Sequence, residues 1–212
     1  MINPSTTSDF DPVVHIVDDD EAVLDSLKTL LNSLNINNAT YSNGQEFLDA
    51  IAATEIHTLT GCVVMDVRMP GISGIECQQA LKDLGCNLPI IFVTGHGDVP
   101  MAVQAIKEGA IEFIQKPYRE QELIDCIQSA IQQNIQSQQN ILYAREVALR
   151  IHSLTSREQE VMRRVISGQA NKTIATELHL SQRTIDIHRA NVMEKMQATS
   201  LADLVTMVLT QD

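Results

Sequence analysis

Four short apolar stretches of the chain each end in polar residues whose types suit phosphoryl chemistry. The first ends in two carboxylates, the second in a carboxylate, the third in a hydroxyl and the fourth in an amine. The stretches and their ends are residues 13–17 with Asp18 and Asp19, 62–65 with Asp66, 89–93 with Thr94, and 111–115 with Lys116. A short apolar run bounded by turn signals is typical of a strand buried on both faces of a parallel sheet. Such sheets bind ligands at the carboxyl ends of their strands, so we expect these side chains to converge at one edge.

The expected convergence suggests a magnesium site beside a nucleophilic carboxylate. Three crowded carboxylates repel one another unless a cation lies between them. Oxygen ligands that leave coordination positions for water suit Mg²⁺. The ion would screen the repulsion between Asp66 and a phosphoryl donor, and carboxylates are known to form aspartyl phosphates. Lys116 would neutralise one phosphoryl oxygen, and the Thr94 hydroxyl would donate a hydrogen bond to another.

These residues resemble the receiver domain of two-component response regulators over residues 12–130. The matching positions are Val17-Asp18-Asp19, Met65-Asp66, Val93-Thr94 and Lys116-Pro117, and residues 94–103 are similar to the FixJ branch of the family. The resemblance implies that Asp66 accepts a phosphoryl group from a sensor histidine kinase. It also implies that Asp19, Asp66 and the backbone carbonyl of Arg68 bind Mg²⁺, with Asp18 assisting through water. Phe113 matches the switch aromatic of the family, where many members carry Tyr.

The elements that would position these residues form a doubly wound α/β unit. Segments of helical periodicity separate the apolar stretches, which is the signature of βαβ units in a parallel sheet. An edge strand at residues 37–42 brings the expected strands to five, in the flavodoxin-like order 2-1-3-4-5. We expect five helices, at residues 23–34, 47–51, 73–84, 98–109 and from residue 120 onward.

A Gln-rich stretch separates this unit from the rest of the chain. Residues 131–140 contain no Gly or Pro, and apolar residues keep a roughly helical phase from Ile127 to Leu149. We expect residues 131–151 to be a helical linker, with a solvated, partly frayed tether as the alternative. Residues 1–130 have 6 Lys and Arg against 19 Asp and Glu, whereas residues 131–212 have 9 against 8. The acidic first half suits a cation, and the mildly basic second half makes a modest case for nucleic acid.

The second half has the pattern of a helix-turn-helix. Thr155 and Glu158 have the spacing of a capping box, Asn171 begins a short helix, and Ser181 precedes a helix that runs to about Gln197. Two helices joined by a short turn form a helix-turn-helix. Residues 152–212 resemble the LuxR-type DNA-binding domain, an all-α unit of four helices, and again are nearest to FixJ-type regulators. The matching stretches are residues 154–158, 171–175 and 184–193.

That resemblance places the helix after Ser181 in the major groove of double-stranded DNA. Residues near its start would read base edges, and basic or amide side chains would bind phosphates. The candidates for these DNA contacts are Lys172, Gln182, Arg183, Thr184, Asp186, Ile187, Arg189, Asn191 and Lys195. Asp186 departs from members that have Lys there, because a carboxylate repels phosphate but accepts a hydrogen bond from cytosine N4.

Together these features predict a response regulator that a kinase phosphorylates at Asp66. We expect it to form a homodimer on phosphorylation, bind promoter DNA and act with RNA polymerase. A small phosphatase with an appended domain and a constitutive DNA binder are the alternatives. Because no substrate-pocket motif or separate general acid accompanies Asp66, we expect no enzyme.

Two expectations concern the cell. The sequence has no apolar stretch of membrane-spanning length and no signal peptide, so we expect a cytoplasmic protein. Residues 192–198 resemble regulators of alternative respiration, tetrathionate reduction among them, which favours a respiratory or metabolic operon as the target.

Overall fold

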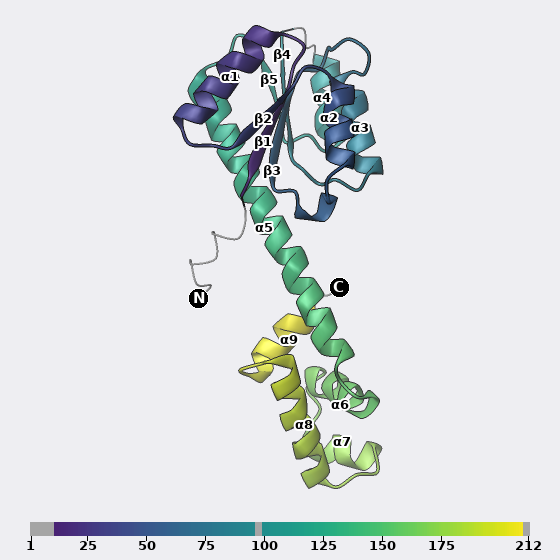
Figure 1. Cartoon of the computed structure of the whole chain (residues 1–212). Helices are drawn as coiled ribbons and strands as arrows, with labels where there is room; N and C mark the ends of the chain where they lie inside the picture. Colours follow the sequence, from purple (N-terminus) through teal and green to yellow (C-terminus); the bar gives the residue numbers. More distant parts are fainter. Residues whose placement is uncertain (1–10, 96–98, 210–212) are drawn as a thin grey trace. The chain divides into compact units, whose positions relative to one another are not determined.

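The computed structural model describes residues 11–95 and 99–209. The chain divides into two units, Met1–Gln138 and Gln139–Asp212. Figure 1 shows a twisted sheet with helices on both of its faces in the first unit, and helices alone in the second. The division falls inside a long helix, so each unit contains part of that helix.

The apolar runs form one parallel sheet in the first unit. Its strands are β1 (Val13–Val17), β2 (Asn38–Tyr41), β3 (Gly61–Met65), β4 (Ile90–Thr94) and β5 (Glu112–Gln115). Their order is β2-β1-β3-β4-β5, which confirms the predicted topology. Every residue of β3 and β4 is buried, as expected for central strands that are covered on both faces.

Two helical layers cover the sheet. On one face lie α1 (Glu21–Ser33) and the first turns of α5 (Glu120–His152), and on the other lie α2 (Gly44–Ala52), α3 (Gly74–Asp83) and α4 (Val99–Lys107). Leu27 of α1 and Leu123 of α5 pack against Ile16 and Val64, whereas Phe47 of α2 and Leu81 of α3 pack in a second cluster with Met65. Successive strand residues face opposite layers, which is why neighbouring positions of one strand belong to different clusters.

One local feature differs from the sequence expectations, and one expectation stays untested. A short 3₁₀ helix, Ile56–Thr58, precedes β3 and was not predicted. The fourth helix is described from Val99 onward, whereas its predicted start at Asp98 lies outside the described residues.

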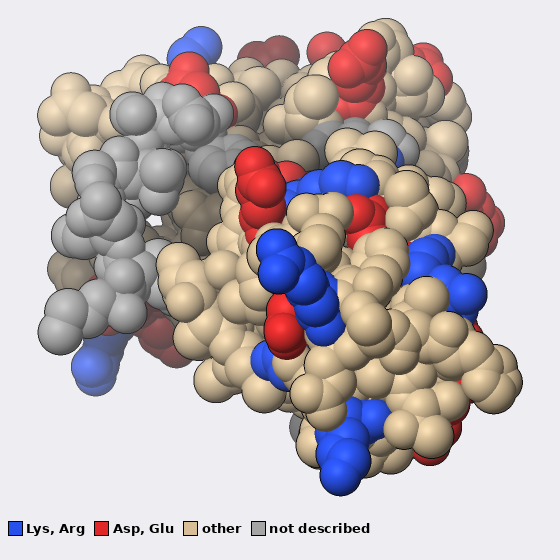
Figure 2. Space-filling model, turned by 90° about the horizontal axis from the view of Figure 1, so that it is seen from below, with Lys and Arg blue, Asp and Glu red and all other residues tan. Residues whose placement is uncertain are grey.

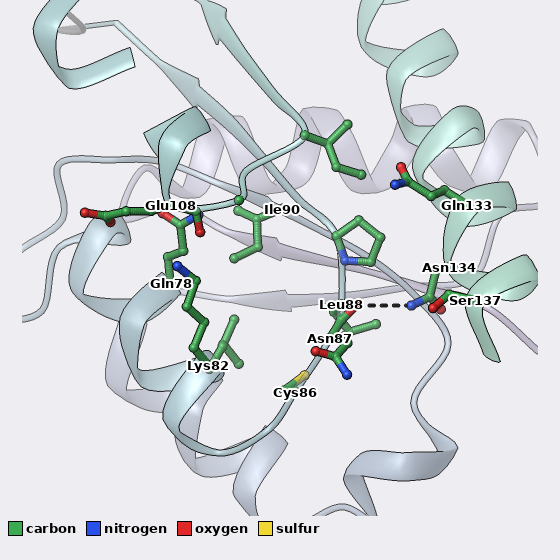
Figure 3. Close-up of a pocket in the computed structure, with 14 residues that line it drawn as sticks. Gln78, Lys82, Cys86, Asn87, Leu88, Ile90, Glu108, Gln133, Asn134 and Ser137 are labelled. Atoms are coloured by element: carbon green, nitrogen blue, oxygen red, sulfur yellow. Dashed lines mark hydrogen bonds between the residues drawn. The ribbon is translucent and has the colours of Figure 1, made fainter. Parts of the chain in front are cut away.

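The fifth helix continues from the first unit through the whole of residues 131–151. Within the first unit, Asn134 ties this helix to the sheet. Its side chain is only 3% exposed, its Oδ1 accepts a hydrogen bond from the Gly61 N–H at 3.0 Å, and its Nδ2 donates to the Asn87 carbonyl at 3.4 Å. A hollow of about 250 Å³ lies beside this contact, at the amino end of β4 and just before β5 (Figure 3), at the opposite edge of the sheet from Asp66.

The second unit consists of the end of α5 followed by α6 (Ser156–Ile166), α7 (Asn171–Glu177), α8 (Gln182–Met196) and α9 (Leu201–Leu209). Thr155 and Glu158 form the predicted capping box, and Ser181 caps α8 by accepting from the Thr184 N–H. One apolar cluster joins Val147 of α5 to α6, α8 and α9, and another joins α6 to α7 and the start of α8. The residues of the predicted domain 152–212 are described as far as residue 209.

Candidate functional site

The carboxyl ends of four strands bring the predicted polar residues to one edge of the sheet. Strand register aligns Val17 with Met65, so Asp18 and Asp66 follow adjacent strands at the same level. Lys116 follows β5, and its Nζ lies 2.7 Å from Asp18 Oδ2 although 98 residues separate them in sequence. Parallel pairing therefore assembles an acidic and basic cluster from distant parts of the chain.

Asp66 is a buried carboxylate with unused hydrogen-bonding capacity. It is 8% exposed, and its Oδ2 accepts a hydrogen bond from the Arg68 N–H at 3.1 Å. Its other oxygen, Oδ1, is buried and has no hydrogen-bond partner among the residues that the structure describes. Buried polar atoms are nearly always hydrogen-bonded, so an oxygen of this kind is one that a cation or an incoming group would satisfy.

Asp18 lies between a cation and a second carboxylate. Its Oδ1 accepts from the Asp20 N–H at 3.0 Å, and its Oδ2 accepts from Lys116. Burial raises the pKa of Asp18, and the negative charge of Asp66 raises it further, while the hydrogen bond from Lys116 lowers it. Two carboxylates that repel each other in this way are stabilised when a cation binds between them.

The structure does not gather all three predicted carboxylates into one ligand cluster. Among the described residues, no group of three or more His, Cys, Asp and Glu side chains could hold a metal ion. Asp19 is exposed in the turn after β1, where Asp20 caps α1 by accepting a hydrogen bond from the Ala22 N–H at 2.9 Å. The geometry of this cap leaves Asp18, and not Asp19, as the carboxylate of the turn that is buried near Asp66.

The remaining donors still fit magnesium. Mg²⁺ usually keeps several waters and is bound through one or two carboxylates, so Asp66, one carboxylate of the Asp18–Asp19 pair and a backbone carbonyl would suffice. The unpartnered Oδ1 of Asp66 supplies a free ligand atom. The backbone carbonyl in the predicted ligand set belongs to Arg68, which is exposed in the loop after β3.

Thr94 and Phe113 occupy the last two strands. Thr94 is fully buried at the end of β4, and the strand pairing aligns Phe92 with Phe113. The Phe113 ring is half-buried, with its centroid 6.3 Å from that of Phe92 and the two planes inclined by 49°. Phe113 thus lies at the margin of the core, packed against its buried residues. The loop residues 96–98 that follow Thr94 lie outside the described residues.

Gly74 is a part of this site that the sequence analysis missed. It is the first residue of α3, and a Cβ atom there would come within 2.4 Å of the Asp66 backbone carbonyl. The Gly74 N–H also donates to the Val67 carbonyl at 2.9 Å. Glycine therefore allows α3 to begin directly against the peptide of Asp66. The predicted helix at residues 73–84 already located this helix start, but the sequence pattern did not show that Gly74 lies against the peptide of Asp66.

In the second unit, α8 exposes most of the predicted base-reading residues. Gln182, Arg183, Asp186 and Ile187 are exposed, while Ile185, Val192 and Met196 are buried on the opposite side of the helix. Thr184 is partly buried, and its hydroxyl is hydrogen-bonded to the hydroxyl of Ser181 at 2.8 Å. Thr184 therefore supports the helix start, in addition to any contact with DNA.

Several of the predicted DNA contacts are already engaged within the protein. Asn171 of α7 donates to Asp186 Oδ1 at 2.7 Å, and Arg189 donates to Asn171 Oδ1. Lys195 Nζ lies 2.7 Å from Glu158 Oε2, a carboxylate that is 3% exposed. The hydrogen bond from Lys195 is the main reason why the pKa of Glu158 falls to about 2, with the capping bonds from Thr155 adding to it. Lys172 is exposed, and Asn191 is half-buried.

Charge is spread thinly over the surface seen in Figure 2. Lys and Arg side chains occur there in small groups among uncharged and acidic residues. A surface of this kind gives weak long-range attraction for a polyanion, so contacts of individual side chains must supply much of the affinity.

Comparisons with known proteins identify two families along the chain. Residues 14–128 match the response regulator receiver domain, and residues 152–208 match the bacterial regulatory proteins of the luxR family. The response regulator protein TodT of Pseudomonas putida is 42% identical over 198 residues, which cover 93% of this chain and 86% of that protein. The transcriptional regulatory protein FixJ of Bradyrhizobium diazoefficiens is 44% identical over 196 residues, covering 92% of this chain and 94% of that protein.

Solved structures agree with these matches. The response regulator StyR superposes with a TM-score of 0.82 at 41% identity, covering 94% of this chain and 98% of its own. Full-length FixJ from B. japonicum has a TM-score of 0.59 at 42% identity, covering 95% and 98%. None of the helices in residues 11–95 and 99–209 is both long and apolar enough to cross a membrane.

Proposed function

The chain belongs to the response regulators that combine a receiver domain with a luxR-type DNA-binding domain, and we propose that phosphorylation of Asp66 controls where and when it binds promoter DNA. As a response regulator it acts in the regulation of transcription. The observation that carries the proposal is the buried Asp66 carboxylate, which has an unpartnered oxygen close to Asp18 and to the ammonium group held by Asp18. A sensor histidine kinase is the proposed phosphoryl donor.

In the proposed reaction, a carboxylate oxygen of Asp66 forms the new bond to phosphorus. The bond between phosphorus and a histidine nitrogen of the kinase breaks, and that nitrogen keeps the electron pair and takes up a proton. Bound Mg²⁺, held by Asp19, Asp66 and the Arg68 carbonyl with Asp18 assisting through water, would neutralise charge on the phosphoryl oxygens. Lys116 would leave Asp18 to pair with one of these oxygens, and the Thr94 hydroxyl would donate to another.

The proposed response to phosphorylation uses the neighbouring face of the receiver. Movement of Thr94 toward the phosphoryl group would open space for Phe113, which lies half-buried on the next strand. The adjoining helix α4 exposes Val103 at 47% and Ile106 at 44%. Their exposure supports a homodimer formed through α4, β5 and α5, which would present two copies of α8 to a twofold DNA site.

Three narrower points also belong to the proposal. Transcriptional control would operate through contact with RNA polymerase at the promoter, and the protein would work in the cytoplasm. Regulation of a respiratory operon stays a prediction from residues 192–198, because the names of the relatives above do not specify a tetrathionate stimulus.

A footprinting experiment tests the proposal. DNA fragments that the wild-type protein retains would be footprinted with and without acetyl phosphate and Mg²⁺, using wild type and Asp66→Asn. We expect phosphodonor to strengthen protection for the wild type and to have no effect on Asp66→Asn. Equal protection by both proteins under both conditions would instead indicate a constitutive DNA binder with a structural receiver.

A further inference from the structure

A single amide connects the two helices of the helix-turn-helix. Asn171 is the first residue of α7, and its side chain reaches two residues of α8. Its Nδ2 donates to Asp186 Oδ1 at 2.7 Å, and its Oδ1 accepts a hydrogen bond from Arg189 Nη1. The two partners are residues already expected to contact DNA, one through a base and the other through a phosphate.

The amide of Asn171 lies between two opposite charges of one helix. Residues three apart on a helix are neighbours, so an aspartate and an arginine with this spacing can pair with each other directly. Within the described part of the chain, no ion pair joins Asp186 to Arg189, whereas Arg157 and Glu160, which have the same spacing, pair directly at 2.8 Å. Asn171 therefore takes the place that a direct salt bridge would occupy.

The consequence follows from what each group still has to offer. An amide has both donors and an acceptor, so Asn171 can bind the carboxylate and the guanidinium at the same time. Asp186 keeps its second oxygen, and the guanidinium keeps the N–H groups that do not bind Asn171, since an arginine has five. A direct salt bridge would instead satisfy each charge with the other. The amide thus holds both groups in place and leaves each able to bind a ligand.

We propose that Asn171 is a specificity-determining residue of the DNA-binding unit, because it positions Asp186 to accept a hydrogen bond from a base and Arg189 to bind a phosphate. The inference deepens the proposed function and rests on α8 entering the major groove. A carboxylate only accepts hydrogen bonds, so its target is an exocyclic amino group, N4 of cytosine or N6 of adenine. Guanine O6 and thymine O4 are acceptors, and a carboxylate in this position disfavours them.

The test is a selection from randomised double-stranded DNA with the phosphorylated full-length chain. The proteins compared are wild type, Asn171→Ala, Asp186→Ala and the double variant. Thr173→Ala is the matched control, because Thr173 is an exposed residue of the same short helix and lies outside the amide contact. We expect Asn171→Ala and Asp186→Ala to lose preference at the same base pair by about 5- to 100-fold, the range for one base contact. The double variant should lose no more than either single variant, and Thr173→Ala should select the wild-type sequence.

A second measurement separates positioning from a simple phosphate contact. If Arg189 turns toward Asp186 when the amide is absent, the plot of log affinity against log salt for Asn171→Ala should become less steep by about one phosphate contact. Loss of preference at the shared base pair should accompany this change.

Several results would overturn the inference. One is an Asn171→Ala variant that binds all sequences more weakly by the same factor and keeps the wild-type preference. Another is an Asp186→Ala variant with unchanged selection, and this decides the matter even where Asn171→Ala fails to fold, because Asp186 is exposed. If the phosphorylated wild type selects no sequence, the proposed function fails and takes this inference with it. By contrast, if the wild type selects a sequence but Asn171→Ala and Asp186→Ala lose preference at different base pairs, only the role of Asn171 is refuted.

Discussion

Replacing Lys116 with methionine should slow phosphorylation of Asp66 by about 10- to 100-fold while leaving the receiver folded. Methionine retains an unbranched side chain and removes the positive charge. In the structure this charge lies 2.7 Å from Asp18 Oδ2, with the Lys116 side chain 25% exposed and that of Asp18 7% exposed. The pair is thus largely screened from water at the edge where phosphoryl transfer is proposed to occur.

The magnitude follows from the strength of one charge-assisted hydrogen bond. Such bonds contribute about 1.5–3 kcal/mol net, and Lys116 would transfer its bond from Asp18 to a phosphoryl oxygen. Losing that interaction in the transition state raises the barrier by a similar amount, and each 1.4 kcal/mol is about tenfold in rate. The ground state changes less, because removal of Lys116 raises the pKa of Asp18 further and the buried carboxyl group can then take up a proton.

Intact-protein mass spectrometry gives the measurement, as the time course of phosphoryl adduct formed from acetyl phosphate with Mg²⁺. Lys107→Met is the control, since Lys107 is an exposed lysine in the last turn of α4 and its replacement changes the net charge equally. We expect Lys107→Met to match wild type. Equal rates for Lys116→Met and Lys107→Met, with both proteins folded by circular dichroism, would refute the assigned role of Lys116.

Three further predictions concern the scaffold. Burial lowers the pKa of His15 from 6.5 to about 4, so the unfolded chain takes up the proton at a higher pH than the folded chain does. The free energy of unfolding should therefore be full above pH 6.5 and about 2 kcal/mol lower at pH 5. Urea unfolding should show this pH dependence in wild type and lose it in His15→Phe. Gly74→Ala should destabilise the receiver by about 1–3 kcal/mol and slow phosphoryl adduct formation, because the added Cβ displaces the peptide of Asp66. Wild-type stability in urea unfolding together with a wild-type rate of adduct formation would contradict the close contact between Gly74 and Asp66. Lys195→Met should raise the pKa of Glu158 and lower the free energy of unfolding at pH 7 by about 1 kcal/mol, a small value because Lys195 is 37% exposed. The difference between variant and wild type in chemical unfolding should disappear as the pH falls from 4.5 toward 2, where Glu158 becomes protonated.

The strands and their order could be predicted because the central strands are continuous apolar runs that end in polar residues. Burial on both faces forces this composition, and a parallel βαβ arrangement then fixes which ends meet. The capping residues Thr155 and Ser181 were readable for the same reason, since a local hydrogen bond depends on short spacing alone.

Contacts between distant residues were harder to predict. Asp18, Asp19 and Asp20 are chemically identical, and only the turn geometry decides that one is buried, one exposed and one caps α1. The charge of Lys195 suggested a phosphate contact, but its partner Glu158 lies 37 residues earlier in the chain. Asn171 was recognised as a helix start, whereas its bridge to Asp186 depends on how α7 packs against α8.

The buried amide of Asn134 has a consequence for how α5 is set against the sheet. Gly61 adopts a φ of +130°, and a Cβ there would come within 1.9 Å of the Val13 carbonyl, so the backbone at the start of β3 is closely confined. An aliphatic side chain at position 134 could be buried at several rotations of the helix about its own axis. The amide satisfies the Gly61 N–H and the Asn87 carbonyl at only one of them. Asn134 therefore selects a single rotational setting of α5, and a turn of the helix away from it would leave a buried backbone N–H without a partner.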